Sequence, residues 1–176
     1  MGEQIKYRIV KTFGKIEIRH YPQLVIAKVD GYGDNGFNIL FQYISGNNRQ
    51  RTSLEMTAPV LSEQIKMTAP VLSDSRSLAF VIPHDYSLET TPEPLDERVK
   101  IMSISERFVA ALRFSGRWSE SNFNNKSKEL MDDLAKVALR TRGNIFVMRY
   151  SGPFTPWFLR RNEVAIEIEL DKNFET

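Results

Sequence analysis

An internal repeat of strands and helices limits the folds open to this chain more than any other feature of its sequence. Two long stretches each run, by hydrophobic periodicity, strand, strand, glycine, helix, strand, strand. The second strand of each stretch ends in a similar tail, Ala27–Gly31 in the first and Leu112–Gly116 in the second. The pattern predicts two pseudo-symmetric ββαββ halves, about residues 1–90 and 91–176, that arose by duplication.

The length and composition favour one domain that contains both halves. Among the 176 residues no stretch of Pro, Gly and Ser is long enough for an interdomain linker, and the 41% hydrophobic content is sufficient for a core. Two helices packed on a strongly curved sheet bury the apolar faces of such a repeat. We therefore expect a single α+β domain over residues 1–176, folded as a distorted, mostly antiparallel β-barrel with two helices.

Apolar residues at helical spacing predict the two helices. The first helix carries four of them on one face, Phe37, Leu40, Phe41 and Ile44. The second begins near Ser119 or Ser121. We expect Gly143 to end it, because glycine commonly terminates helices.

The charge pattern and the lack of cysteine exclude several classes of function. The 24 basic and 22 acidic residues are interspersed without a basic stripe, so we do not expect nucleic-acid binding. Because there is no Cys, disulfides and thiolate metal sites are excluded, which suits a reducing compartment. The first ten residues resemble neither a signal peptide nor a membrane span. We expect a cytoplasmic protein without a membrane span.

The sequence contains no set of nucleophile, base and orienting group that indicates an enzyme. The two histidines, His20 and His84, are far apart, and no nucleophile or phosphate-binding motif is present. Glu163 lies beside Arg161 and is either a tuned acid or one partner of a structural ion pair, and we favour the ion pair. We therefore expect a ligand-binding protein and not an enzyme.

A second, sharper repeat identifies a family. The segment Met56–Ser62 recurs unchanged as Met67–Ser73. Together with five further motifs, in the same order along nearly the whole chain, it resembles the SOUL haem-binding protein family, in particular bacterial or archaeal members with tandem segments of this kind. The five motifs are Glu17–Tyr21, Tyr43–Asn48, Phe80–Pro83, Pro92–Asp96 and Arg161–Val164.

The resemblance implies a haem or tetrapyrrole binder that acts as a carrier or buffer, with haem as its cofactor and no other metal. It also implies the barrel with two helices that the repeat predicts. Because the family is similar in fold to bacterial effector-binding domains, the alternative is capture of other flat or cationic small molecules. A third hypothesis is a protein-interaction scaffold without a small ligand.

The resemblance maps a hydrophobic haem-binding groove onto the apolar face of the first helix. The residues concerned are Phe37, Leu40, Phe41 and Ile44, and at least two of them are expected to pack against the sheet instead. Some relatives carry a basic residue at the start of this helix, where this chain has Asp34. Substitutes that could meet a haem propionate are Arg49, Arg51 and Lys66, which are otherwise solvated charges.

The same resemblance makes His20 a candidate axial ligand of haem iron. Strand alternation places His20 on the face of Ile16 and Ile18, where a neutral imidazole is able to bind iron. The alternative is a hydrogen-bonded structural histidine. Met56 and Met67 are candidate ligand contacts or core residues, and we expect only one of them to contact a ligand. In the loop near residue 157, Trp157 and Phe158 either cover a pocket mouth or anchor the loop.

Overall fold

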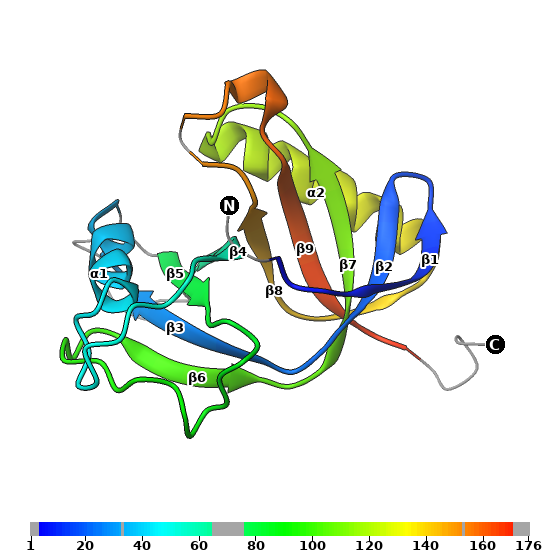
Figure 1. The fold of residues 1–176 in the computed structure, drawn as a ribbon. Helices are drawn as coiled ribbons and strands as arrows, with labels where there is room; N and C mark the ends of the chain where they lie inside the picture. The colour runs from blue at the N-terminus through cyan, green and yellow to red at the C-terminus, as the bar shows by residue number, and fades with distance from the viewer. Residues whose placement is uncertain (1–3, 33, 65–75, 153, 171–176) are drawn as a thin grey trace, which may run out of the picture. The chain divides into compact units, whose positions relative to one another are not determined.

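The computed structural model describes residues 4–32, 34–64, 76–152 and 154–170, and within these ranges it contains two α-helices and nine strands (Figure 1). The predicted α+β class is confirmed, and the strand pairs within each unit described below are antiparallel. The chain forms two compact units, and each unit takes residues from both halves of the sequence.

Unit 1 contains Gln23–Ser105 and the N-terminal residues through Ile5. Its strands lie in the order β4-β5-β3-β6, and α1 packs on β3 and β5. The core between helix and sheet includes Leu40, Tyr43 and Phe80. The elements are β3 (Leu24–Asp30), α1 (Asp34–Ile44), β4 (Thr57–Gln64), β5 (Arg76–Val81) and β6 (Lys100–Ile104).

Unit 2 contains Lys6–Pro22 and the residues from Glu106 onward. Its strands lie in the order β1-β2-β7-β9-β8, and α2 packs on β7 and β9 through Phe123, Leu130 and Leu134. The elements are β1 (Arg8–Phe13), β2 (Ile16–Tyr21), β7 (Arg107–Phe114), α2 (Glu120–Lys136), β8 (Arg140–Arg149), the short 3-10 helix η1 (Trp157–Leu159) and β9 (Asn162–Glu169).

The first strand of each ββαββ repeat pairs within the unit formed by the other repeat. In unit 2, β2 from the first repeat pairs with β7, with Ile18 opposite Ala110. In unit 1, β6 from the second repeat pairs with β3, with Met102 opposite Ile26. The repeats are therefore continuous in sequence, whereas the compact units are not.

The start of α2 agrees with the sequence, but its end does not. Ser119 is the N-cap, and its hydroxyl accepts a hydrogen bond from the Asn122 N–H at 3.2 Å. The prediction that Gly143 ends this helix is wrong, because α2 ends at Lys136 and Gly143 lies within β8. The chain leaves the helix through Ala138, a non-glycine residue with φ of 54°.

Candidate ligand-binding site

Two phenylalanine rings lie on the solvent side of α1. Phe37 and Phe41 are one helical turn apart and are 40% and 50% exposed. Their rings are nearly parallel, with centroids 6.2 Å apart and planes inclined by 11°. Phe37 also meets the edge of the Phe80 ring at 5.2 Å, which anchors the pair to the sheet of unit 1. The two rings form an exposed apolar surface.

The periodicity of α1 explains why these rings remain outside. Leu40 and Ile44 are buried against the sheet together with Ile39 and Tyr43. At 3.6 residues per turn, the large apolar side chains of α1 span roughly 200° of the helix circumference, about twice the stripe of roughly 100° that a surface helix commonly buries. The sheet covers one part of this arc, and the two phenylalanines occupy the other. The helix therefore carries more apolar surface than its own core requires.

Contacts near both ends hold α1 in place within unit 1. A Cβ added to Gly36 would lie 3.1 Å from Cγ2 of Val29, so the start of the helix approaches β3 as closely as a glycine allows. Near the other end, the Tyr43 hydroxyl donates a hydrogen bond of 2.5 Å to the carbonyl of Pro92. The aromatic pair is thus presented by a helix that is held at both ends.

His20 lies on β2 in unit 2, at the edge of an apolar core. Ile16 and Ile18, on the same face of the strand, are fully buried, whereas the His20 side chain is 27% exposed. Its ring packs against Phe108 with centroids 5.0 Å apart. Its Nε2 lies 3.6 Å from a carboxylate oxygen of Glu106. The imidazole is therefore accessible and already has an acidic neighbour.

Of the two candidate methionines, Met56 lies in the described part of the chain and Met67 does not. Met56 is partly buried and packs against the core of unit 1, just before β4. Met67 lies outside the described residues, as does the whole second copy, residues 67–73. The structure places the four expected residues of α1 and Met56 in unit 1, and it places His20 in unit 2.

Two of the three basic residues that could meet a haem propionate lie in the described part of the chain, and both are exposed. Arg49 is exposed and lies 3.5 Å from the carboxylate of Glu93, which is exposed as well. Arg51 is exposed and has φ of 50°. Lys66 lies outside the described residues. These arginines are therefore available to an anionic group only from the surface.

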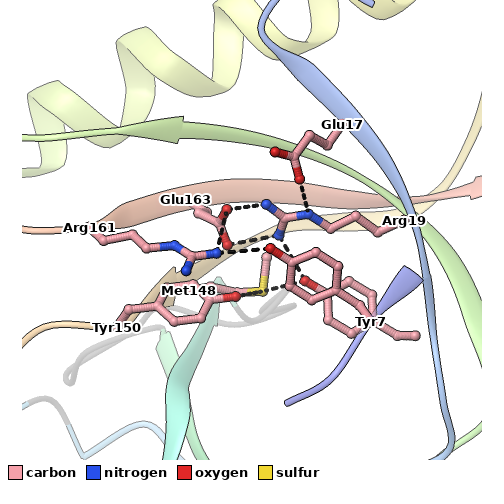
Figure 2. Close-up of polar contacts among 8 residues, drawn as sticks. Tyr7, Glu17, Arg19, Met148, Tyr150, Arg161 and Glu163 are labelled. Atoms are coloured by element: carbon pink, nitrogen blue, oxygen red, sulfur yellow. Dashed lines mark hydrogen bonds and ion pairs between the residues drawn. The ribbon is translucent and has the colours of Figure 1, made fainter. Parts of the chain in front are cut away.

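A buried polar cluster in unit 2 was not expected from the sequence (Figure 2). Arg19 and Glu163 are 1% and 0% exposed and form a two-pronged ion pair, in which Nη1 donates to Oε1 at 2.8 Å and Nη2 to Oε2. The Arg19 Nη1 also donates to the Tyr21 hydroxyl, and its Nε donates to Glu17, each at 2.9 Å. The guanidinium lies 4.2 Å from the ring centre of Tyr7. Each of the three guanidinium nitrogens of Arg19 therefore donates at least one hydrogen bond.

Arg161 extends the cluster toward the surface. Its Nη2 donates to the Tyr7 hydroxyl at 3.0 Å and lies 3.6 Å from Oε2 of Glu163. Its guanidinium stacks over the ring of Tyr150 at 3.9 Å. The ion pair expected between Arg161 and Glu163 is present, but Arg19 is the closer and more buried partner of this carboxylate.

The electrostatics of the cluster fix its protonation. Burial alone would raise the pKa of Glu163, but the hydrogen bonds and charge of Arg19 outweigh burial and lower this pKa. Burial raises the pKa of Tyr21 and of Tyr150 above their ordinary value. Glu163 is therefore anionic and the two phenols are protonated at neutral pH. This is the state expected of a structural ion pair and not of a proton donor.

The residues present fit a flat apolar ligand. The exposed pair of near-parallel rings on α1 offers apolar contact to such a ligand. Among the described residues, no group of three or more acidic or histidine side chains is placed to hold a metal ion. Neither α1 nor α2 has the length and apolar character to cross a bilayer.

The chain is thus an α+β protein that presents an exposed aromatic pair on α1. This chain belongs to the SOUL heme-binding protein family, which it matches over residues 2–167. It is 28% identical to the mouse protein Heme-binding protein 2 over 174 residues, which are 88% of this chain and 82% of the relative. Its identity to the human protein of the same name is also 28%, over 89% of this chain and 83% of the relative.

Solved structures share the fold at much lower identity. The chain aligns with the C-terminal domain of EcmrR with a TM-score of 0.62 and 11% identity, covering 94% of this chain and 99% of that domain. In the EcmrR–DNA complex the TM-score is 0.65 at 9% identity, and the alignment covers 89% of this chain but only 57% of the EcmrR chain. These likenesses extend to the fold alone.

Proposed function

We propose that this protein binds haem or a related tetrapyrrole reversibly and acts as a carrier or buffer, not as a catalyst. The observation that carries the proposal is the exposed aromatic pair on α1, Phe37 and Phe41, in a chain of the SOUL heme-binding family. The names of the human and mouse relatives support haem as the ligand. Haem supplies the iron chemistry when bound, and the protein supplies the surface that holds it.

The energetics of this surface favour a planar ligand. Covering the exposed faces of the two rings contributes roughly 25 cal/mol for each Å² of apolar area removed from water, before ordering costs. Those costs are reduced because the rings already stack on each other and Phe37 rests on Phe80. Leu40 and Ile44 are buried in the core of unit 1, so we expect them to support the helix and not to contact the ligand.

The proposed axial ligand is His20. Its imidazole is partly exposed and lies against Phe108, so the ring is accessible to a ligand. Because Nε2 lies 3.6 Å from Glu106, coordination through that nitrogen competes with this carboxylate. Haem binding through apolar contact and ligation by His20 are separate proposals that separate variants test.

A hemin titration followed by Soret absorbance tests the apolar surface. We expect the wild-type protein to saturate at one equivalent and the Phe37→Ala/Phe41→Ala variant to bind at least about tenfold more weakly, because each lost ring removes on the order of 1–2 kcal/mol of burial. Leu88→Ala, which also removes an exposed apolar side chain of unit 1, is the matched control and should bind normally. Equal affinity in the double variant would refute the proposed surface.

The His20→Ala variant, measured in the same titration, tests ligation. If His20 coordinates the iron, the Soret maximum shifts and hemin binds more weakly, whereas His84→Ala changes neither. An unchanged spectrum and affinity in His20→Ala exclude His20 as the ligand and leave apolar binding intact. Non-saturating hemin uptake by the wild type, with saturable binding of tetraphenylphosphonium instead, would contradict the tetrapyrrole function itself.

A further inference from the structure

The connection between β8 and β9 exposes an unusual amount of apolar surface at one end of unit 2. Figure 1 shows this loop, with η1, projecting past the strand ends beside the start of α2. Four of its large apolar side chains are solvent-exposed, and we call them the aromatic tip: Phe154 (99%), Trp157 (48%), Phe158 (57%) and Leu159 (64%). Four such side chains within six residues form a patch of the kind that marks an interaction site.

The loop is internally hydrogen-bonded, so the exposure of the tip belongs to its folded form. At the base, the Tyr150 N–H donates to the Arg161 carbonyl at 3.2 Å. Within the loop, the Leu159 N–H donates to the Pro156 carbonyl at 2.9 Å, and Arg160 Nε donates to the Thr155 carbonyl at 3.0 Å. The four apolar side chains are therefore exposed on a hydrogen-bonded loop.

Arginines surround the base of the tip. Arg117, which is exposed, lies 5.3 Å from the ring centre of Trp157. Arg160 and Arg149 lie 4.2 Å and 5.2 Å from the ring centre of Trp118, beneath the loop. Residues 150–161 contain no Asp or Glu. The flanking acids are Glu120, at the start of α2, and Glu163, which is buried and paired with Arg19.

We propose that the aromatic tip docks this protein peripherally on an anionic membrane surface, independently of haem binding. Trp and Phe favour the interfacial region of a bilayer, where an apolar ring and a polar edge are both accommodated. Arg117 lies where it would meet lipid phosphates once Trp157 enters that region, and the basic base of the loop favours anionic lipid. The short exposed tip is suited to the headgroup boundary and not to the full depth of a bilayer.

The charge of the loop argues against a second copy of the chain as the occupant. A twofold contact through the aromatic tip would place the same arginines of both copies near each other, and of the two flanking acids only Glu120 is exposed to offset them. An anionic bilayer supplies the opposite charge and an apolar layer together, which neither a neutral bilayer nor a copy of this chain does.

Cosedimentation with lipid vesicles tests the proposal on the full chain without hemin. We expect binding to vesicles of phosphatidylcholine mixed with phosphatidylglycerol, weaker binding to phosphatidylcholine alone, and weakening by added salt. Trp157→Ala/Phe158→Ala should bind the mixed vesicles at least about tenfold more weakly, since two inserted rings are removed.

Trp157→Phe should retain binding but lose most of the blue shift in tryptophan fluorescence that lipid causes, because Trp118 is the only other tryptophan.

Leu95→Ala, which removes an exposed leucine of unit 1, is the matched control and should bind vesicles as the wild type does. Circular dichroism checks that each variant is folded. The proposal is overturned if the wild type binds neither vesicle, or if the double variant of the tip binds as well as the wild type. It is also overturned if the wild type does not bind vesicles but forms a dimer in solution, and the double variant of the tip is monomeric.

Discussion

The buried pair of Arg19 and Glu163 shows what single residues of this sequence reveal and what they do not. Strand alternation places Arg19 and Tyr21 on the face of β2 opposite Ile16 and Ile18, and this much is readable from the sequence. The carboxylate that makes burial of Arg19 tolerable lies 144 residues away, on β9. No local pattern indicates such a partner, because it depends on how distant strands pair. The sequence therefore predicts an unusual polar face but not its buried pairing.

Removing both members of this pair should cost less than the two single removals added together. In Glu163→Leu, Arg19 remains buried without its main partner, and we expect a loss of about 3–5 kcal/mol in the free energy of unfolding. In Arg19→Met/Glu163→Leu neither member of the pair is left buried without the other, so the loss should be smaller than the sum of the two single losses. Urea denaturation of the four proteins measures the coupling. Additive losses would show that the pair does not act as a unit.

At the scale of single elements, the helices show how far local patterns reach. The apolar spacing of α1 predicts its presence, but Ile39 and Tyr43 are apolar too, so spacing alone does not select the side that faces the sheet. The prediction for the end of α2 is wrong for a different reason. Gly143 is the first glycine after the helix, whereas the chain turns earlier at Ala138. Gly143, with φ of 73°, instead lies in the irregular part of β8 between Arg142 and Phe146.

The same alanine-to-glycine change should have opposite effects at two positions near the end of α2. Ala135 lies within the helix, where glycine costs about 1 kcal/mol. Ala138 has a left-handed backbone that strains any residue with a Cβ, so relief of this strain should offset the greater freedom of glycine in the unfolded chain. Thermal unfolding should show Ala135→Gly clearly destabilised and Ala138→Gly unchanged or stabilised. Equal losses in both variants would contradict the left-handed turn.

At the scale of the whole molecule, the order of elements follows from the sequence but their partners do not. The repeat pattern predicts ββαββ twice, and the structure contains that order, from β2 to β5 and from β6 to β9. The repeat pattern does not predict that β2 pairs with β7, or that β6 pairs with β3. By hydrophobic pattern alone, β2 and β6 could each pair with a strand of their own repeat. The expected halves, about residues 1–90 and 91–176, are therefore units of sequence and not of packing.

This exchange of strands predicts how the protein responds to being divided between the halves. A fragment of residues 1–90 lacks β6, the edge partner of β3, and exposes β2 without β7. A fragment of residues 91–176 lacks β2 and leaves one edge of β7 unpaired. Because a missing strand exposes both apolar surface and backbone polar groups, neither fragment should fold alone. An equimolar mixture should regain the native circular dichroism spectrum and cooperative unfolding. Cooperative unfolding of either isolated fragment would contradict this prediction, because it would show that one half of the sequence folds alone. The control is an intact chain with a protease site inserted between residues 90 and 91, which shows the effect of the insertion without cleavage.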